Sequence, residues 1–128
     1  MNLDHAAAGD LLERYVRAWQ DFDGDAWTAL FTEDAAYHED PFEPPLVGHN
    51  AFRAYLLEAG ETQAQVEMTV ARHWVEGPMV LAAWHASFIR VPDRVHVRLD
   101  GFMTLEVAVD GRISRFREWW HRRETPSA

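Results

Sequence analysis

His38 and Asp40 are the residues whose types and spacing could do chemistry together. They stand two positions apart in a short alternating segment that Pro41 ends. Side chains of a strand alternate between its faces, so His38 and Asp40 share one face, while Tyr37 and Glu39 share the other. A histidine and a carboxylate that leave a strand together form a proton-transfer pair if they face a cavity. They are surface groups if they face outward, and the spacing alone leaves both readings open.

A helix must come before this strand. Residues 5–22 carry apolar side chains at three- and four-residue spacing, which is typical of an amphipathic helix. Tyr15 and Trp19 lie one turn apart on its buried side. The run 23–25 breaks this helix, and Asp25 is expected to cap a short second one.

The strand itself is expected over 35–40, followed by a loop that contains three prolines. A third helix is predicted from about 50 to 59. Asn50 is its expected cap and Gly60 its expected end.

From residue 63 onward the period changes from 3.6 to 2, which predicts long antiparallel strands joined by short turns. In the most regular strand Val97, Leu99 and Met103 face one way, and Asp100 faces the other. Asp110-Gly111 is a strong hairpin turn. In the last strand Phe116, Glu118 and Trp120 share one face, and the opposite face is expected to carry Ile113, Arg117, Trp119 and His121.

These elements predict an α+β fold in which one curved, mainly antiparallel sheet wraps over three N-terminal helices as a cone. The open end of such a cone is a natural ligand cavity. At 128 residues and 48% hydrophobic composition, a single domain over 1–128 is expected.

The charge and the composition of the chain exclude several classes of binding partner and of chemistry. The net charge of −9 argues against nucleic acid and anionic membranes. The chain has no cysteine, which removes thiolate chemistry and disulfides. There is no apolar run near membrane-spanning length and no signal-peptide pattern, so a cytoplasmic protein is expected.

The sequence resembles the SnoaL-like branch of the nuclear transport factor two superfamily along nearly its whole length. The matching runs are Tyr15…Trp19, Ala29-Leu30-Phe31, Glu33-Asp34-Ala35, Asp40-Pro41-Phe42, Gly48, Arg53-Ala54-Tyr55, Asp110-Gly111-Arg112-Ile113 and Glu118-Trp119-Trp120-His121. The resemblance implies a cone-shaped α+β barrel that is commonly a homodimer through the outer face of its sheet. It does not select a function, because the superfamily includes isomerases, polyketide cyclases, epoxide hydrolases, dehydratases and binding modules.

Ketosteroid isomerase is the nearest chemical parallel within that superfamily. Tyr15 resembles its helix tyrosine, and Asp40-Pro41 resembles its catalytic aspartate followed by proline. His38 departs from the isomerase pattern, which has an apolar residue there. Asp100 resembles the third member, but it lies on the polar face of its strand, and only a bulge at Gly101 would turn it inward.

The predicted catalytic residues are therefore Asp40 as general base, Tyr15 as donor to an oxyanion, and His38 as an assisting acid or base. A loop aspartate, a core tyrosine and a buried histidine are the structural alternatives. Glu118 interrupts an aromatic face, so it needs a partner or a wet cavity, and Arg53 and His38 are the candidate partners. The predicted substrate-binding residues are Trp19, Phe31, Phe42, Trp84, Phe88, Asp100, Glu118 and Trp120.

No cofactor is expected. A metal site built from His38, Asp40, Glu118 and His121 is a weak alternative, because these residues lack metal-ligand spacing. We therefore expect a cofactor-independent enzyme that moves protons on a small hydrophobic carbonyl compound, of isomerase, cyclase or dehydratase type. The alternative is a non-catalytic module of the same fold that binds a small molecule or supports a dimer.

Overall fold

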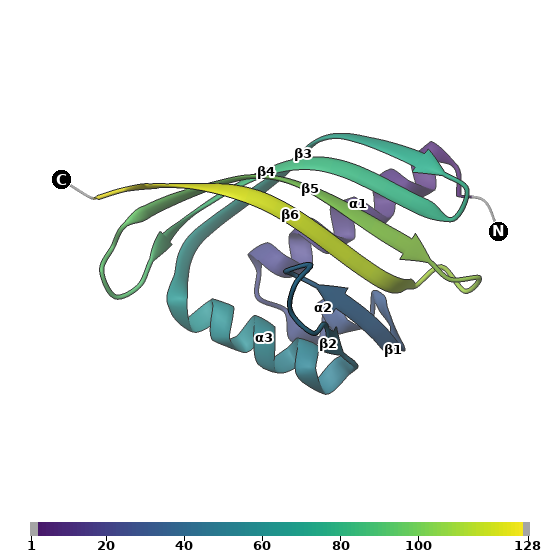
Figure 1. The fold of residues 1–128 in the computed structure, drawn as a ribbon, viewed down its shortest axis with the longest axis horizontal. Coiled ribbons are helices and arrows are strands. Elements are labelled where there is room, and N and C mark those ends of the chain that lie inside the picture. The colour runs from purple at the N-terminus through teal and green to yellow at the C-terminus, as the bar shows by residue number, and fades with distance from the viewer. Residues whose placement is uncertain (1–2, 127–128) are drawn as a thin grey trace.

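The computed structural model describes residues 3–126 (Figure 1). The elements follow one another as α1 (His5–Gln20), α2 (Gly24–Thr28), β1 (Phe31–His38), β2 (Leu46–Val47), α3 (His49–Thr62), β3 (Gln63–Glu76), β4 (Met79–Arg90), β5 (His96–Val107) and β6 (Ile113–Thr125). The α+β class and the helices-then-meander order predicted from the sequence are confirmed.

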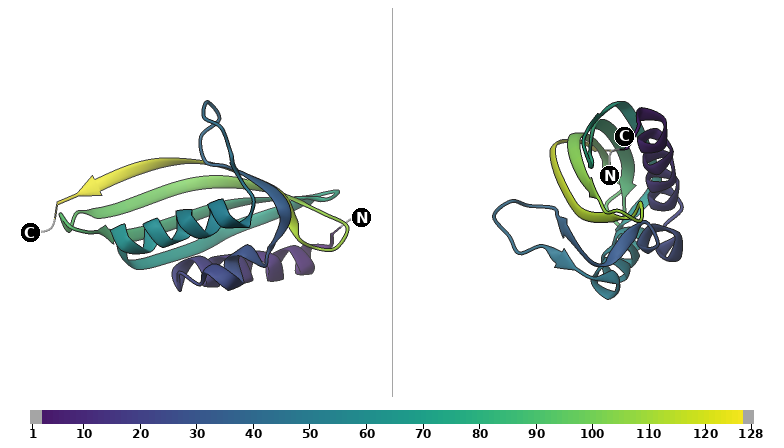
Figure 2. Two further views of the ribbon diagram at one scale, coloured as in Figure 1. Left: turned by 90° about the horizontal axis from the view of Figure 1, so that it is seen from below. Right: turned by 90° about the vertical axis from the view of Figure 1, so that its right-hand side faces the viewer.

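The strands form one sheet in the order β2-β1-β6-β5-β4-β3. Neighbouring strands are antiparallel, except that β1 lies parallel to β6. The long strands curl, and α1 and α3 lie against the same face of the sheet (Figure 2). The loop between β1 and β2 projects away from the rest of the molecule in both views. The result is the half-open cone that the alternating patterns predicted.

The helix boundaries differ from the predictions for local reasons. α1 ends at Gln20, two residues before Phe22. Asp23, rather than Asp25, caps α2 by accepting a hydrogen bond from the backbone N–H of Ala26 at 3.1 Å. Asp25 instead forms an ion pair with Arg53.

The third helix begins at His49 and continues to Thr62, so neither of its expected boundaries is correct. Gly48 occupies the capping position with a φ of 86°, a conformation that suits glycine. Asn50 lies inside the helix, and Gly60 does not end it. A glycine in a helix costs only about 1 kcal/mol, which burial of the apolar side of the helix can offset.

The core between the helices and the sheet is strongly aromatic. Trp27, Phe31, Tyr37, Phe52 and Phe116 are all at most 1% exposed. Their rings touch, with Phe31 and Phe52 centroids 4.8 Å apart and Tyr37 and Phe116 stacked at 4.5 Å. Phe31 was predicted to bind substrate. Its side chain is instead buried in this core, where it packs against the other aromatic rings.

A bulge near the start of β6 changes which of its side chains face the core. Val107 pairs with Ile113, whereas Glu106 pairs with Arg115, so Ser114 is an extra residue. Ile113 and Phe116 are both fully buried as a result. The prediction that Ile113 lies on the outer face is wrong, because simple alternation does not register the inserted residue. Beyond the bulge, Glu118 and Trp120 face inward and Trp119 outward, as predicted.

Candidate functional site

A cavity of about 100 Å³ lies between the sheet and the helices. Its walls come from α1, α3 and the inner faces of β1 and β3 to β6. The lining residues are Tyr15, Trp19, Tyr37, Glu39, Tyr55, Gln63, Val66, Met68, Trp84, Ala86, Phe88, Leu99, Glu118, Trp120 and Arg122. Of the predicted site residues, the structure brings Tyr15, Trp19, Trp84, Phe88, Glu118 and Trp120 together here.

Glu118 is the most deeply placed carboxylate of this cavity, only 9% exposed. The hydroxyl of Tyr37 donates a hydrogen bond of 2.8 Å to its Oε1 atom. Burial raises the pKa of Glu118 to about 8, and the negative charge of Glu39 adds to the increase, while the hydrogen bond from Tyr37 opposes it. Glu118 therefore holds a proton at neutral pH. Its expected partners were Arg53 and His38, and its actual partner is Tyr37.

Glu39 is a second carboxylate that lines the same cavity, from the end of β1. It is half-buried, and it interacts with the hydroxyl of Tyr55 on α3. Burial first, then the charges of Glu118 and Glu39, hold the pKa of Tyr55 well above its usual range. The cavity thus contains two carboxylates, each with a tyrosine hydroxyl beside it.

Tyr15 lies at the inner wall, as predicted, and is 2% exposed. Its ring stacks on Phe116 with centroids 5.3 Å apart. Burial and then the proximity of Glu118 raise the pKa of the Tyr15 hydroxyl, so it stays protonated and able to donate a hydrogen bond. Its role as donor to a substrate stays a prediction.

His38 and Asp40 take the face opposite to the cavity. Because Tyr37 points into the core, the strand alternation sends Glu39 inward and its two neighbours outward. Partial burial and then the nearby Arg115 and Arg117 lower the pKa of His38. The carboxylate of Asp40 is exposed and accepts a 2.9 Å hydrogen bond from the backbone N–H of Phe42. Neither residue lines the cavity, so their expected meeting with Tyr15 does not occur in this structure.

A wider groove of about 1020 Å³ adjoins the cavity and shares Tyr37, Glu39, Glu118 and Trp120 with it. The loop after β1 and the middle of β5 and β6 form its other walls. Asp40 and Phe42 line this groove, and Phe42 is 92% exposed. The predicted binding residue Phe42 therefore belongs to the approach to the cavity rather than to its interior.

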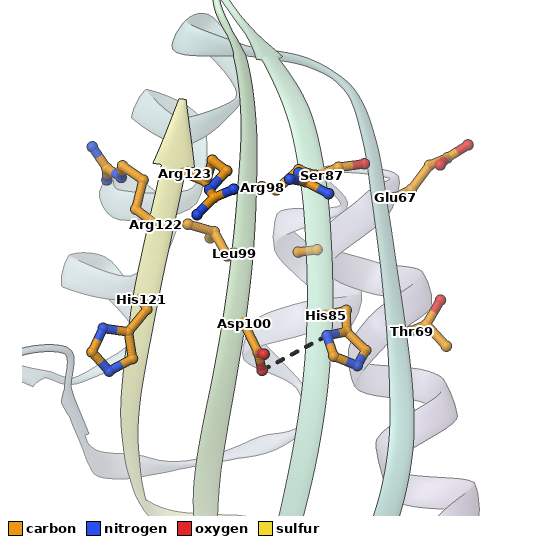
Figure 3. Close-up of a pocket in the computed structure, with 11 residues that line it drawn as sticks. Glu67, Thr69, His85, Ser87, Arg98, Leu99, Asp100, His121, Arg122 and Arg123 are labelled. Atoms are coloured by element: carbon orange, nitrogen blue, oxygen red, sulfur yellow. Dashed lines mark ion pairs between the residues drawn. The ribbon is translucent and has the colours of Figure 1, made fainter. Parts of the chain in front are cut away.

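Asp100 points away from the cavity, toward the outer face of the sheet (Figure 3). Its carboxylate lies 3.7 Å from Nδ1 of His85 on the neighbouring strand. The pairing of β4 with β5 runs without interruption through Gly101, so the bulge that would have turned Asp100 inward is absent from this strand pair. The structure therefore does not bring Asp100 to Tyr15. Glu118, rather than Asp100, is the protonated acid of this cavity.

Sequence reasoning missed Tyr37, Glu39 and Tyr55 as site residues. The signal was available in Tyr37, since a large aromatic residue favours the buried face of a strand more than a histidine does. If Tyr37 is assigned to the inside, Glu39 follows by alternation. Nothing in the sequence alone indicated that Tyr55 would reach Glu39 from another element.

Within residues 3–126, no three histidine, aspartate or glutamate side chains lie close enough to hold a metal ion. No helix in the same range is long and apolar enough to cross a membrane.

The curled sheet, the helices on one of its faces and the cavity between them define the cone-shaped α+β class of small domains. A family model for the SnoaL-like domain matches residues 12–116, so the chain belongs to the SnoaL-like family. No curated protein sequence gives a match.

Three solved structures illustrate the likeness of fold. The epoxide hydrolase/cyclase-like enzyme SalBIII, described in pyran ring formation in polyether salinomycin, is 22% identical over 92% of this chain and 93% of its own, with a TM-score of 0.82. An LEH-like epoxide hydrolase from M. tuberculosis is 23% identical over 91% of this chain and 84% of its own, with a TM-score of 0.76. A protein described as a SnoaL-like polyketide cyclase, from Shewanella denitrificans, is 13% identical over 89% of this chain and 90% of its own, with a TM-score of 0.79. At these identities the likeness concerns the fold.

Proposed function

We propose that this protein is a cofactor-independent enzyme that transfers protons on a small hydrophobic carbonyl compound, of isomerase, cyclase or dehydratase type. The observation that carries the proposal is the pair of carboxylates in one apolar cavity. Glu118 is buried and protonated, and Glu39 is half-buried and keeps contact with solvent. A buried, protonated carboxyl group and a second, more accessible carboxyl group in one cavity are suited to act as acid and base in one reaction.

In the proposed reaction, Glu39 removes a proton from the carbon next to the carbonyl group. The C–H bond breaks, its electron pair moves toward the carbonyl oxygen, and Glu118 donates its proton or a hydrogen bond to that oxygen. Tyr15 donates a hydrogen bond to the same developing charge. Return of the proton from Glu39 to another carbon, while the enol oxygen gives its proton back to Glu118, completes an isomerisation. In a cyclisation the enol carbon instead attacks a second carbonyl group, whose oxygen takes the proton held by Glu39, and the first carbonyl group re-forms as its oxygen returns the proton to Glu118.

The apolar walls support this proposal. Aromatic side chains line the cavity together with the two carboxylates, namely those of Trp19, Trp84, Phe88 and Trp120. This surface favours a hydrophobic substrate and excludes water from the carboxyl group of Glu118. Membership in a family whose solved relatives by fold include a cyclase-like enzyme and an epoxide hydrolase is consistent with acid/base chemistry.

Deuterium exchange is a direct test, because it detects proton removal whatever the natural product is. A panel of small cyclic enones is incubated in D₂O and followed by NMR. We expect the wild type to accelerate exchange at the carbon next to the carbonyl. Glu39→Gln and Glu118→Gln should each reduce the rate by about 10²-fold or more.

Asp40→Asn is the matched comparison, since Asp40 is the neighbour of Glu39 on the opposite face. Its exchange rate should remain close to that of the wild type. Loss of exchange in Asp40→Asn with full activity in Glu39→Gln would instead support Asp40, with His38, as the base first expected from the sequence. Binding of the enones without exchange in any variant would favour the non-catalytic binding module.

A further inference from the structure

The end of the cavity away from Tyr37 and Tyr55 has a different chemistry. Arg122 lines it, and among the described residues it is the cavity's only basic side chain. Arg122 lies on the inner face of β6, because Glu118, Trp120 and Arg122 follow one another at two-residue spacing after the bulge. Gln63, at the start of β3, lines the cavity too and offers an amide.

The side chain of Arg122 has no ion pair or hydrogen bond with another described residue. The arginines at 14, 17, 53, 90, 112 and 115 all pair with carboxylates. Arg98 and Arg123, on the outer face of the sheet, also have no carboxylate partner among the described residues, but Arg122 differs from them in lining this cavity. Its guanidinium group retains its full set of donors for an anion from outside the protein.

The wall between these two ends is apolar. Glu118 and Arg122 are four residues apart on one strand, which corresponds to about 13 Å between their Cα atoms. Met68, Trp84, Phe88 and Leu99 line the cavity along with them. The cavity therefore has a protonated acid at one end, a hydrophobic middle and a cation at the other end.

We propose that the ligand of this cavity is an elongated hydrophobic compound with a neutral oxygen at one end and an anionic group, such as a carboxylate, at the other, and that Arg122 binds the anionic group. The inference rests on the proposed function in so far as the neutral oxygen is the group that Glu118 protonates. The charge on the ligand is a separate property. It orients the molecule so that its oxygen, rather than its other end, meets Glu118.

The test compares a planar hydroxynaphthoate, whose hydroxyl and carboxylate stand at opposite ends of the rings, with its methyl ester. Dissociation constants are measured by calorimetry for the wild type, Arg122→Gln and Arg123→Gln. Arg123 is the matched control, because it is the next residue and lines only the outer groove (Figure 3), whereas Arg122 reaches both that groove and the cavity. We expect the wild type to bind the carboxylate about fivefold more tightly than the ester, as for a partly exposed charge pair.

Arg122→Gln should remove this preference by weakening carboxylate binding alone, and Arg123→Gln should keep it. The preference should also shrink as salt is added. Equal binding of the acid and the ester by the wild type, no binding of either, or the same loss in Arg123→Gln would each overturn the inference. Deuterium exchange on neutral enones is unaffected by those outcomes, so the failure of this inference and that of the proposed reaction are distinguishable.

Discussion

At the scale of single residues, Glu118 is the most informative group in this protein. Its carboxyl is buried in an aromatic core and accepts one hydrogen bond, from Tyr37. A charged carboxylate at that position would be costly, because one hydrogen bond does not replace hydration. The raised pKa of Glu118 is the direct consequence, and it ties the stability of the fold to pH.

The free energy of unfolding should fall as pH rises from about 4.5 to about 8, and level off above that. Within this window the unfolded chain releases the Glu118 proton while the folded protein retains it, so rising pH favours unfolding. The loss should be on the order of 5 kcal/mol. Glu118→Gln keeps an acceptor for Tyr37 but cannot ionise, so its urea denaturation midpoint should exceed that of the wild type at pH 8 and match it near pH 4.

Tyr37→Phe provides the opposite control. The hydrogen bond from Tyr37 favours the charged form of Glu118, so its removal should carry the decline in stability to a higher pH. If the wild type and Glu118→Gln show the same pH dependence, Glu118 ionises normally and is not the acid of the site.

At the scale of elements, the strands explain how much of the site the sequence could predict. The regular alternation of β5 placed Val97 and Met103 in the core and Asp100 outside, as the structure confirms. In β1, His38 and Asp40 were expected to face the cavity, although the large aromatic Tyr37 favoured the other parity. The structure has that other parity, with Tyr37 stacked on Phe116 in the core. Such packing depends on two distant segments, which no local pattern encodes.

Gly101 shows the same dependence on a partner strand. It lies opposite Trp84 on β4, and a Cβ atom at Gly101 would come within 2.3 Å of Cζ2 of Trp84. The indole of Trp84 therefore lies across the glycine, and it holds the cavity wall in place. From the sequence this glycine suggested a bulge, whereas its function here is to leave space for a ring.

Gly101→Ala should destabilise the fold by about 1–3 kcal/mol, because the added methyl group must displace the indole of Trp84. The double variant Gly101→Ala with Trp84→Leu should recover part of that loss, relative to Trp84→Leu alone. Thermal denaturation of the four proteins gives the coupling energy. Additive effects would show that the methyl group and the indole do not compete for space.

At the scale of the whole molecule, the outer face of the sheet has an ordered arrangement of side chains. Reading across the strands from β3 to β6, one row runs Glu67, Ser87, Arg98 and Arg123, and the next runs Thr69, His85, Asp100 and His121. Three further rows follow along the strands. Their end residues, on β3 and on β6 respectively, are Arg72 and Trp119, then Trp74 and Arg117, and last Glu76 and Arg115. Trp74 and Trp119 are 38% and 39% exposed.

A two-fold axis parallel to the strands, between β4 and β5, would place the β3 side of one copy over the β6 side of another. Each row then contains at least one complementary pair. Glu67 faces Arg123, His85 faces Asp100, Glu76 faces Arg115, and each exposed tryptophan faces an arginine of the second copy. We propose that two copies of this chain pair through this face in the register that the charge pattern favours.

Charge reversal distinguishes this register from a general attraction between sheets. Glu67 and Arg123 of one chain are three strand spacings apart, about 14 Å, so they hardly interact within the monomer. In a two-fold dimer their contact occurs twice. We expect Glu67→Arg to weaken dimerisation at least about tenfold in sedimentation velocity, because two attractions become two repulsions. Adding Arg123→Glu to the same chain should restore the dimer, since both contacts are then reversed together.

Two outcomes would contradict this arrangement. If the double variant is as monomeric as Glu67→Arg, the two residues do not meet across the interface. A monomeric wild type at micromolar concentration would exclude the dimer itself.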